Sequence, residues 1–372
     1  MKNKKFFNNF FVTKLHIDLI LLICIILILS LSIIVTWSAI GGNEYIFQNK
    51  LIQMLLGFII MIIFAQIPPK FYEKYAFSLY FFCILSLTIV CIIGHISKGA
   101  QRWLDLEFIK FQPSEIIKIA IPLIIAKIIN KSIHPMSLKK YFQIMILIMI
   151  PTILIINEPD LGNGVLIFIS GLCILFLSGL SWKIIINNLI IILLIIPISW
   201  FGFIHEYQKE RIFMLFHPES DPLNRGYHII QSKIAIGSGG LIGKGWLNGT
   251  QNQYEFLPEK STDFIFAVLA EEFGFIGVVL LIILYTILIF RGMILALKSE
   301  NFFGKITISG IISILFFYIF VNIGMVSGLL PVVGIPLPLF SYGGTSLIVS
   351  LASFGIIMSI HTHKKIIPKK DT

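Results

Sequence analysis

The chain has 372 residues, of which 57% are hydrophobic and only 13% are charged, and its mean hydropathy is +0.92. That composition excludes a single soluble domain, because one core could not bury so much apolar surface. The formal net charge of +10 does not indicate nucleic-acid binding, since no basic cluster is interleaved with aromatic residues that could stack on bases.

Uninterrupted apolar runs of about 17 to 25 residues, the length that crosses a bilayer as a helix, recur along the whole chain. We count ten, so the sequence predicts an all-α, polytopic membrane protein of ten transmembrane helices. The fourth and fifth runs are short or carry polar residues, and the pattern also allows a count that differs by one. No cleavable signal peptide is expected, because the first run is long and no small-residue cleavage pattern follows it. The runs cover residues 19–39, 51–67, 75–94, 113–130, 141–156, 163–179, 183–204, 264–290, 306–329 and 345–362.

Basic residues are distributed unequally between the two sides of the expected bundle. Eighteen Lys and Arg residues fall in the segments on the side of the termini, and four fall in the short loops opposite, at Lys50, Lys98, Arg102 and Lys110. Because positive residues are retained on the cytoplasmic side, both termini are predicted to be cytoplasmic. A basic inner rim that faces anionic lipid then accounts for the net charge. The predicted location is the cytoplasmic (inner) membrane.

One long polar stretch, residues 205–262, separates the seventh run from the eighth and is expected to be extracytoplasmic. It is nearly neutral and rich in Gly, Pro and aromatic residues, so we expect an ordered loop within a single membrane domain of residues 1–372. Its glycine clusters indicate either turns that pack the loop on the bundle or a backbone cradle for phosphate. The four cysteines lie inside apolar runs without metal-ligand spacing, which predicts no tight metal site.

Ionisable residues in and beside the apolar runs are the first candidates for function. Glu115 and Lys118 lie three apart in the first turns of the fourth run, behind a loop that carries Arg102 and Trp103. They form either a charge-neutralising pair beside an interfacial tryptophan or part of a polar path, since ionisable groups inside membranes usually face a cavity. The Glu-Pro-Asp-Leu-Gly stretch at 158–162 favours a structural turn.

The eighth run opens with Asp263 and carries Glu271 and Glu272 about two turns deeper, which is about 12 Å along a helix. Three acids in one span predict a helix that lines a polar cavity. At a helix N-terminus Asp263 would be held ionised, which suits a helix cap as well as a general base. If Ser261 or Thr262 supplies the cap, Asp263 can face a substrate.

Several blocks of sequence resemble the SEDS family (shape, elongation, division and sporulation), and the resemblance extends over nearly the whole chain. Within it, residues 330–336 and 358–363 are more similar to the rod-shape-determining RodA branch than to the division branch. Glu107 and His228 depart from the family pattern, where Gly and Gln are expected. The blocks are Gln-Arg-Trp at 101–103 with Phe-Gln-Pro-Ser-Glu at 111–115, the stretch 226–240, the stretch 256–267 around Asp263, and Leu-Pro-Leu-Phe-Ser-Tyr-Gly-Gly-Thr-Ser at 337–346.

The resemblance implies a peptidoglycan glycosyltransferase that polymerises lipid II at the outer face of the cytoplasmic membrane during cell elongation and rod-shape maintenance. It implies a class B penicillin-binding protein, a monofunctional transpeptidase, as partner, together with other membrane proteins of the elongation complex and membrane lipids. It assigns the catalytic carboxylate to Asp263 and further functional roles to Trp103, Glu115 and Lys118.

The implied reaction fits these residue types. The 4-hydroxyl of an acceptor GlcNAc attacks C1 of a donor MurNAc with inversion, and undecaprenyl pyrophosphate leaves, so a base must take a proton and cations must meet the pyrophosphate. Asp263 is the candidate base. No tightly bound cofactor is expected, although a weakly held divalent cation, Mg²⁺ or Mn²⁺, can share the task. The candidate cations near the outer face are Arg102, Lys110, Arg211, Lys233 and Lys244.

Two other functions stay open on the residues alone. A lipid II flippase or proton-coupled carrier would use Glu115, Lys118, Glu271 and Glu272 as a path across the bilayer, although we detect no inverted repeat. A non-catalytic scaffold for cell-wall assembly would tolerate substitution at Asp263.

Overall fold

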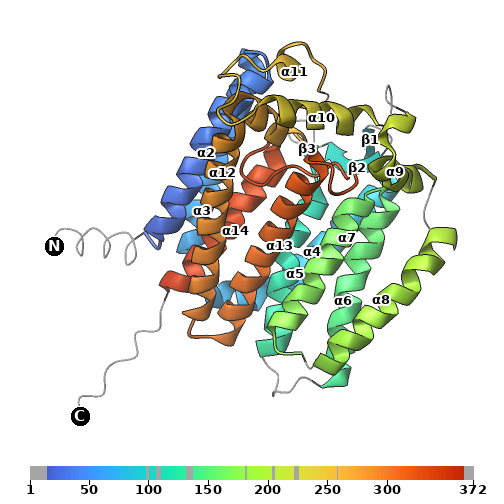
Figure 1. The fold of residues 1–372 in the computed structure, drawn as a ribbon. Helices are drawn as coiled ribbons and strands as arrows, with labels where there is room; N and C mark the ends of the chain where they lie inside the picture. Colours follow the sequence, from blue (N-terminus) through green and yellow to red (C-terminus); the bar gives the residue numbers. More distant parts are fainter. Residues whose placement is uncertain are drawn as a thin grey trace.

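The computed structural model describes residues 15–97, 100–105, 110–130, 137–180, 182–202, 206–221, 226–257 and 259–363. Its long apolar helices lie side by side in one bundle, and short elements gather at one end of that bundle (Figure 1). We call this end, where α10 (Tyr227–Ser238) and α11 (Thr250–Gln253) lie, the loop end. At the opposite end the rings of His16 and His363 stack with centroids 3.7 Å apart, so the first and last described segments meet there.

Each apolar run expected from the sequence coincides with a helix, which confirms the helical class. Seven helices in the described part of the chain (α2, α3, α4, α6, α12, α13 and α14) are long and apolar enough to cross a membrane, and α7 is a shorter apolar helix. The helices of the bundle are α2 (Leu19–Ala39), α3 (Glu44–Gln66), α4 (Pro69–Ile93), α5 (Pro113–Asn130), α6 (Leu138–Asn157), α7 (Leu161–Leu177), α8 (Trp182–Gly202), α12 (Ile265–Leu297), α13 (Phe302–Val326) and α14 (Gly344–Thr362).

The helices differ in how much of their apolar surface the protein itself covers. Helix α5 is buried on nearly every side, whereas α3 buries five residues and exposes large side chains such as Leu55 and Ile52. A helix that is apolar all round and covered on one side only requires an apolar solvent on the other. The bundle therefore has the burial pattern of a multi-pass membrane protein with α5 at its centre.

Helix α3 begins earlier than the hydropathy pattern indicates. The side chain of Asn43 caps it by accepting a hydrogen bond from the amide of Ile46 at 3.2 Å, so the polar residues 44–50 are helical. Lys50, which the loop-charge argument assigned to a short outer loop, is instead a helical residue with 1% exposure. That assignment was wrong because the ammonium is satisfied inside the bundle by side-chain and backbone oxygens.

A small antiparallel sheet at the loop end adds strands that the all-α prediction lacks. It consists of β1 (His95–Ser97), β2 (Ala100–Asp105) and β3 (Lys110–Phe111), with β2 in the middle. Gly94 ends α4 in an extended conformation, and the chain then returns on itself, with His95 opposite Trp103. The strands are two to six residues long, too short for a clear period-two pattern in the sequence.

The long segment between α8 and α12 is largely helical in its described part. It contains α9 (Glu206–Phe216), the short 3-10 turn η1 (Pro218–Ser220), α10 and α11. Helix α10 lies across the loop end of the bundle and packs on α12 (Figure 1).

Helix α12 is sharply bent at Gly274, whose φ of 62° and ψ of −160° are not helical. The side chain of Leu269 lies 3.6 Å from the position that a Cβ on Gly277 would take. Eight residues of straight helix would separate them by about 12 Å. Residues 265–273 and 275–297 therefore run in different directions, which a continuous apolar pattern cannot reveal.

The bend at Gly274 is filled by the backbone of residues 240–245. The amides of Lys244 and Gly245 donate to the carbonyls of Glu271 and Glu272, both at 3.0 Å. A Cβ on Gly243 would stand 2.1 Å from the Glu272 carbonyl oxygen, so only glycine permits this approach. These glycine contacts favour the interpretation of turns that pack the loop on the bundle.

Candidate functional site

Asp263 lies two residues before the start of α12, on a backbone that is held at three consecutive carbonyls. The amide of Tyr342 donates to the Ser261 carbonyl at 2.9 Å, and the hydroxyl of Ser341 donates to that of Thr262. The side-chain amide of Asn322 in α13 donates to the Asp263 carbonyl at 3.0 Å. These three bonds end on backbone carbonyls, so they do not require the carboxylate of Asp263.

Asp263 is half-buried, and its carboxylate lies against residues 334–343, the second part of the segment that connects α13 to α14. One of its oxygens is 3.4 Å from the place a Cβ on Gly334 would occupy. The helix-cap position belongs to Phe264, which makes no side-chain capping bond, and Thr262 bonds to Glu259 instead. The ring of His228 from α10 stacks on Phe264, with centroids 5.7 Å apart. None of the three predicted capping residues therefore occupies the cap position of α12.

A second group of polar residues forms a chain through the centre of the bundle. Lys118 donates to Glu115 at 2.6 Å, and its ammonium lies 3.8 Å from the centroid of the Tyr318 ring. The Tyr318 hydroxyl donates to Asn163 at 2.7 Å, and Asn163 donates to Asp160 at 2.8 Å. The ion pair of Glu115 with Lys118 is one of the two interpretations that the sequence left open. Its continuation through α13 and α7 was not predicted, because it depends on tertiary packing.

The chain of polar contacts ends on Arg102 in β2. The guanidinium donates to the Pro159 carbonyl at 2.6 Å and lies 3.5 Å from a carboxylate oxygen of Asp160. Arg102 thus ties the sheet to the turn between α6 and α7, the turn that the Glu-Pro-Asp stretch predicts. Its neighbour Trp103 is half-buried on the same strand. Lys110, another candidate cation, has a side chain outside the described residues.

Glu158 in the same turn is buried, with 1% exposure. Burial and, to a smaller extent, the negative charge of Asp160 raise the pKa of its carboxyl, Arg102 lowers it, and the net result is a pKa of about 8. In the unfolded chain the carboxyl releases its proton near its ordinary pKa of 4.5, whereas the folded protein keeps the proton until about 8. The stabilising effect of the proton is complete below pH 4.5 and is lost as the pH rises towards 8.

We therefore expect the thermal stability of the protein in detergent to fall between about pH 5 and about pH 8, and Glu158→Gln to remove part of that fall. Melting curves at the two pH values measure the effect. The exposed Glu300 provides the control, since Glu300→Gln should keep the wild-type pH dependence. An unchanged dependence in Glu158→Gln would contradict the buried, protonated carboxyl.

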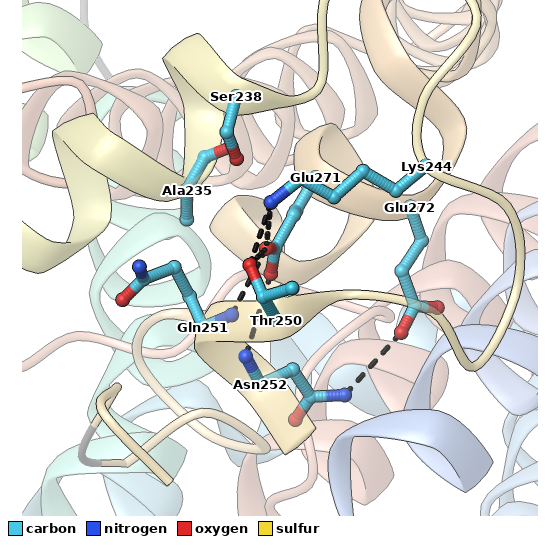
Figure 2. A network of polar contacts seen from close by, with 8 residues as sticks. All are labelled: Ala235, Ser238, Lys244, Thr250, Gln251, Asn252, Glu271 and Glu272. Atoms are coloured by element: carbon cyan, nitrogen blue, oxygen red, sulfur yellow. Dashed lines mark hydrogen bonds and ion pairs between the residues drawn. The ribbon is translucent and has the colours of Figure 1, made fainter. Parts of the chain in front are cut away.

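Glu271 and Glu272 form a buried network with the loop (Figure 2). Glu271 accepts from Lys244 at 2.8 Å, from the hydroxyl of Thr250 at 3.1 Å and from the amide of Gln251 at 2.9 Å. Glu272 accepts from the side chain of Asn252 at 3.3 Å and from the hydroxyl of Ser38 in α2. Lys244, predicted as a pyrophosphate cation, thus pairs with a carboxylate and fastens the loop to α12.

The sequence placed Glu271 and Glu272 about two helical turns deeper in the membrane than Asp263, and this prediction was wrong. Ser38, which bonds Glu272, is next to the last residue of α2, whereas Ser32 donates to Phe340, the neighbour of Ser341. Six residues separate the two serines, about 9 Å along the helix, so the glutamates lie nearer the loop end than the segment that holds Asp263. The reason is the bend of α12, whose first part leads from Asp263 towards the loop end.

The two remaining candidate cations are exposed. The ammonium of Lys233 in α10 lies 2.8 Å from the position a Cβ on Gly328 would take, at the C-terminal end of α13, where a positive charge is favoured by the helix dipole. Arg211 lies on α9. No cluster of three or more potential metal-ligating His, Cys, Asp or Glu side chains occurs among the described residues.

Sequence reasoning missed three residues that hold the backbone at or next to Asp263. Asn322 and Ser341 donate to the carbonyls of Asp263 and Thr262, and Lys50 donates to the carbonyl of Phe340, the residue before Ser341. The only sequence signal for Asn322 is a polar residue within an apolar run, and Ser341 stands in one of the blocks on which the family resemblance rests.

The chain is similar to known proteins over nearly its whole length. The family model of FtsW, RodA and SpoVE, described as cell cycle proteins, matches residues 11–366. Peptidoglycan glycosyltransferase MrdB of Escherichia coli strain K12 is 54% identical over 367 residues, which cover 99% of this chain and 98% of that protein. MrdB of Helicobacter pylori strain J99 is 37% identical over 354 residues, covering 93% and 90%.

Solved structures show the same fold. A chain of a peptidoglycan synthase complex that coordinates polymerization and crosslinking aligns with a TM-score of 0.81 at 31% identity, covering 92% of this chain and 97% of that one. The rod shape determining protein RodA of Thermus thermophilus aligns with a TM-score of 0.71 at 27% identity, covering 92% and 96%.

Proposed function

This chain belongs to the family of FtsW, RodA and SpoVE cell cycle proteins, and on that basis we propose that it is a peptidoglycan glycosyltransferase of the RodA branch. In this proposal it polymerises lipid II into glycan strands during cell elongation. Two relatives that match this chain over more than nine-tenths of its length are named peptidoglycan glycosyltransferases. The observation that carries the proposal within the molecule is the carboxylate of Asp263, mounted on a backbone that three donors hold in place.

The reaction requires one proton transfer and one displacement. Asp263 accepts the proton of the acceptor GlcNAc 4-hydroxyl, the oxygen forms a bond to C1 of the donor MurNAc, and the bond from C1 to the pyrophosphate oxygen breaks. Undecaprenyl pyrophosphate leaves with the electron pair, and the configuration at C1 is inverted. Lys233 and Arg211 are exposed and therefore accessible to the pyrophosphate, whereas Lys244 is half-buried against Glu271. A weakly held Mg²⁺ or Mn²⁺ can assist.

The proposed topology has ten spans, both termini in the cytoplasm and the loop end outside the cytoplasmic membrane. The match between apolar runs and helices supports the count, and the distribution of basic residues supports the orientation. The similarity to a chain from a peptidoglycan synthase complex supports a class B penicillin-binding protein as partner. Elongation-complex membrane proteins and membrane lipids complete the proposed surroundings, without nucleic acid.

The transporter alternative fits the contacts less well. A path across the bilayer through Glu115, Lys118, Glu271 and Glu272 needs these groups in one line, but the glutamates of α12 are bonded to loop residues and to the end of α2. Their role in fastening the loop accounts for their burial without transport.

The proposed activity is tested by glycan-strand formation from purified lipid II. The purified protein should form polymer in detergent or in vesicles, and the assay is run with and without the cognate transpeptidase and with a chelator. Polymer formation without the partner would show that the catalytic residues are complete in this chain. Absence of polymer in every arm, with a protein that melts cooperatively, would contradict the proposal.

A further inference from the structure

Lys50 in α3 is a buried lysine whose ammonium contacts only neutral oxygens. Its Nζ atom lies 2.6 Å from the hydroxyl of Ser32, 3.1 Å from the carbonyl of Phe340 and 3.4 Å from the carbonyl of Ser32, and it also donates to the hydroxyl of Thr36. Its exposure is 1%, and among the described residues no carboxylate lies within ion-pairing distance. The charge is therefore solvated by hydroxyl and backbone dipoles alone.

Stability does not explain a charge at this position. Burying an ammonium without a counter-ion opposes folding even when its donors are satisfied, and an apolar side chain of similar length would fill the space without that cost. Lysine has three donors, and here they bring together a serine and a threonine of α2 and a carbonyl of the 334–343 segment. The contribution of Lys50 is thus to join three separate parts of the chain.

The carbonyl that Lys50 holds belongs to the residue before Ser341. Ser32 donates to the same Phe340 carbonyl at 2.6 Å, so two donors from α2 and α3 fix it. The next two residues, Ser341 and Tyr342, donate to the carbonyls of Thr262 and Ser261. The ammonium is therefore hydrogen-bonded to Phe340, and the two residues that follow Phe340 in the chain are hydrogen-bonded to the backbone that carries Asp263.

We propose that Lys50 is a positioning residue for Asp263, which acts by fixing the 340–342 backbone that in turn holds residues 261–263. The inference rests on the proposed function, because it assigns a role in placing the base of that reaction. Lys50 does not touch substrate, since it is buried beneath the segment that it holds. Its loss changes the placement of the carboxylate and leaves the groups that bind lipid II unchanged.

The test compares Lys50→Met with wild type in steady-state polymerisation of purified lipid II. We expect kcat to fall about 10- to 100-fold, because a misplaced catalytic group loses most of its advantage. KM should stay within about twofold, because substrate contacts persist. The melting temperature should not fall, because the methionine side chain removes a buried charge that opposes folding. Lys305→Met, at an exposed lysine of α13, is the matched control and should keep the wild-type kcat.

A second variant and a second measurement keep the inference testable if Lys50→Met folds poorly. Ser341→Ala removes a later link of the same connection and should lower kcat similarly, and the double variant should be little worse than either single variant. Hydrogen exchange at the Tyr342 amide, which donates to Ser261, should be faster in Lys50→Met. Unchanged exchange or a kcat within about twofold of wild type would overturn the positioning role.

The failure of this inference and the failure of the proposed function give different results. If Asp263→Asn is inactive while Lys50→Met is fully active, the base stands and the positioning role is wrong. If Asp263→Asn is active, the proposed base is wrong whatever Lys50→Met does. A parallel fall of kcat and melting temperature in Lys50→Met, with slow exchange at Tyr342, assigns Lys50 to general stability and also overturns the inference.

Discussion

Asp263→Asn is expected to lower the rate of lipid II polymerisation by about 100- to 10,000-fold, the range by which a positioned general base accelerates a reaction. Asparagine keeps the size of the side chain but cannot accept the hydroxyl proton. The three hydrogen bonds that hold residues 261–263 end on backbone carbonyls, so they persist in the variant. The protein should therefore insert, fold and bind its partner normally while kcat collapses.

The matched control for this variant is Glu255→Gln, which neutralises an exposed acid of the same loop. Its polymerisation rate should equal that of wild type. Melting temperature and co-purification with the transpeptidase should be the same for wild type and both variants. Polymerisation by Asp263→Asn at a rate near that of wild type would remove Asp263 from the mechanism.

The bundle could be predicted because its determinants are local. Each apolar run is long enough to form its own helix, and the first turn of α5 follows from Pro113. The early start of α3 and the bend of α12 could not be predicted from hydropathy. In the sequence Lys50 has the features of a loop residue, and only the fold shows that oxygens from α2 and residues 334–343 surround its ammonium. In the sequence Gly274 does not differ from other glycines in apolar runs, and only the fold shows that residues 240–245 fill the bend at this position.

In the site, too, the local features could be predicted and the contacts between distant segments could not. The pairing of Glu115 with Lys118 depends on a spacing of three positions within one helix, and the motif around Asp263 is continuous in the chain. The partners of these groups come from distant segments. Asn322 reaches Asp263 across 59 residues, and Arg102 reaches the Pro159 carbonyl across 57. Two candidate cations, Arg102 and Lys244, therefore proved to be paired with acids that sequence spacing could not identify as their partners.

Lys118→Met is expected to destabilise the protein by about 3 to 5 kcal/mol, because it leaves the Glu115 carboxylate buried without its counter-ion. The carboxylate is 3% exposed, and the ammonium that is lost also lies against the Tyr318 ring. Thermal unfolding in detergent at neutral pH measures the effect. Polymerisation should fall as well, since the Tyr318, Asn163 and Asp160 contacts begin at this pair.

The double variant Glu115→Gln/Lys118→Met separates the structural role of the pair from its functional role. Removing both charges leaves no uncompensated ion, so the melting temperature should recover most of what Lys118→Met loses. Polymerisation should stay low if the charges act on the substrate, and it should recover with stability if they only hold α5 to α13. A melting temperature of Lys118→Met equal to that of wild type would contradict a buried pair, because an exposed carboxylate loses little when its partner is removed.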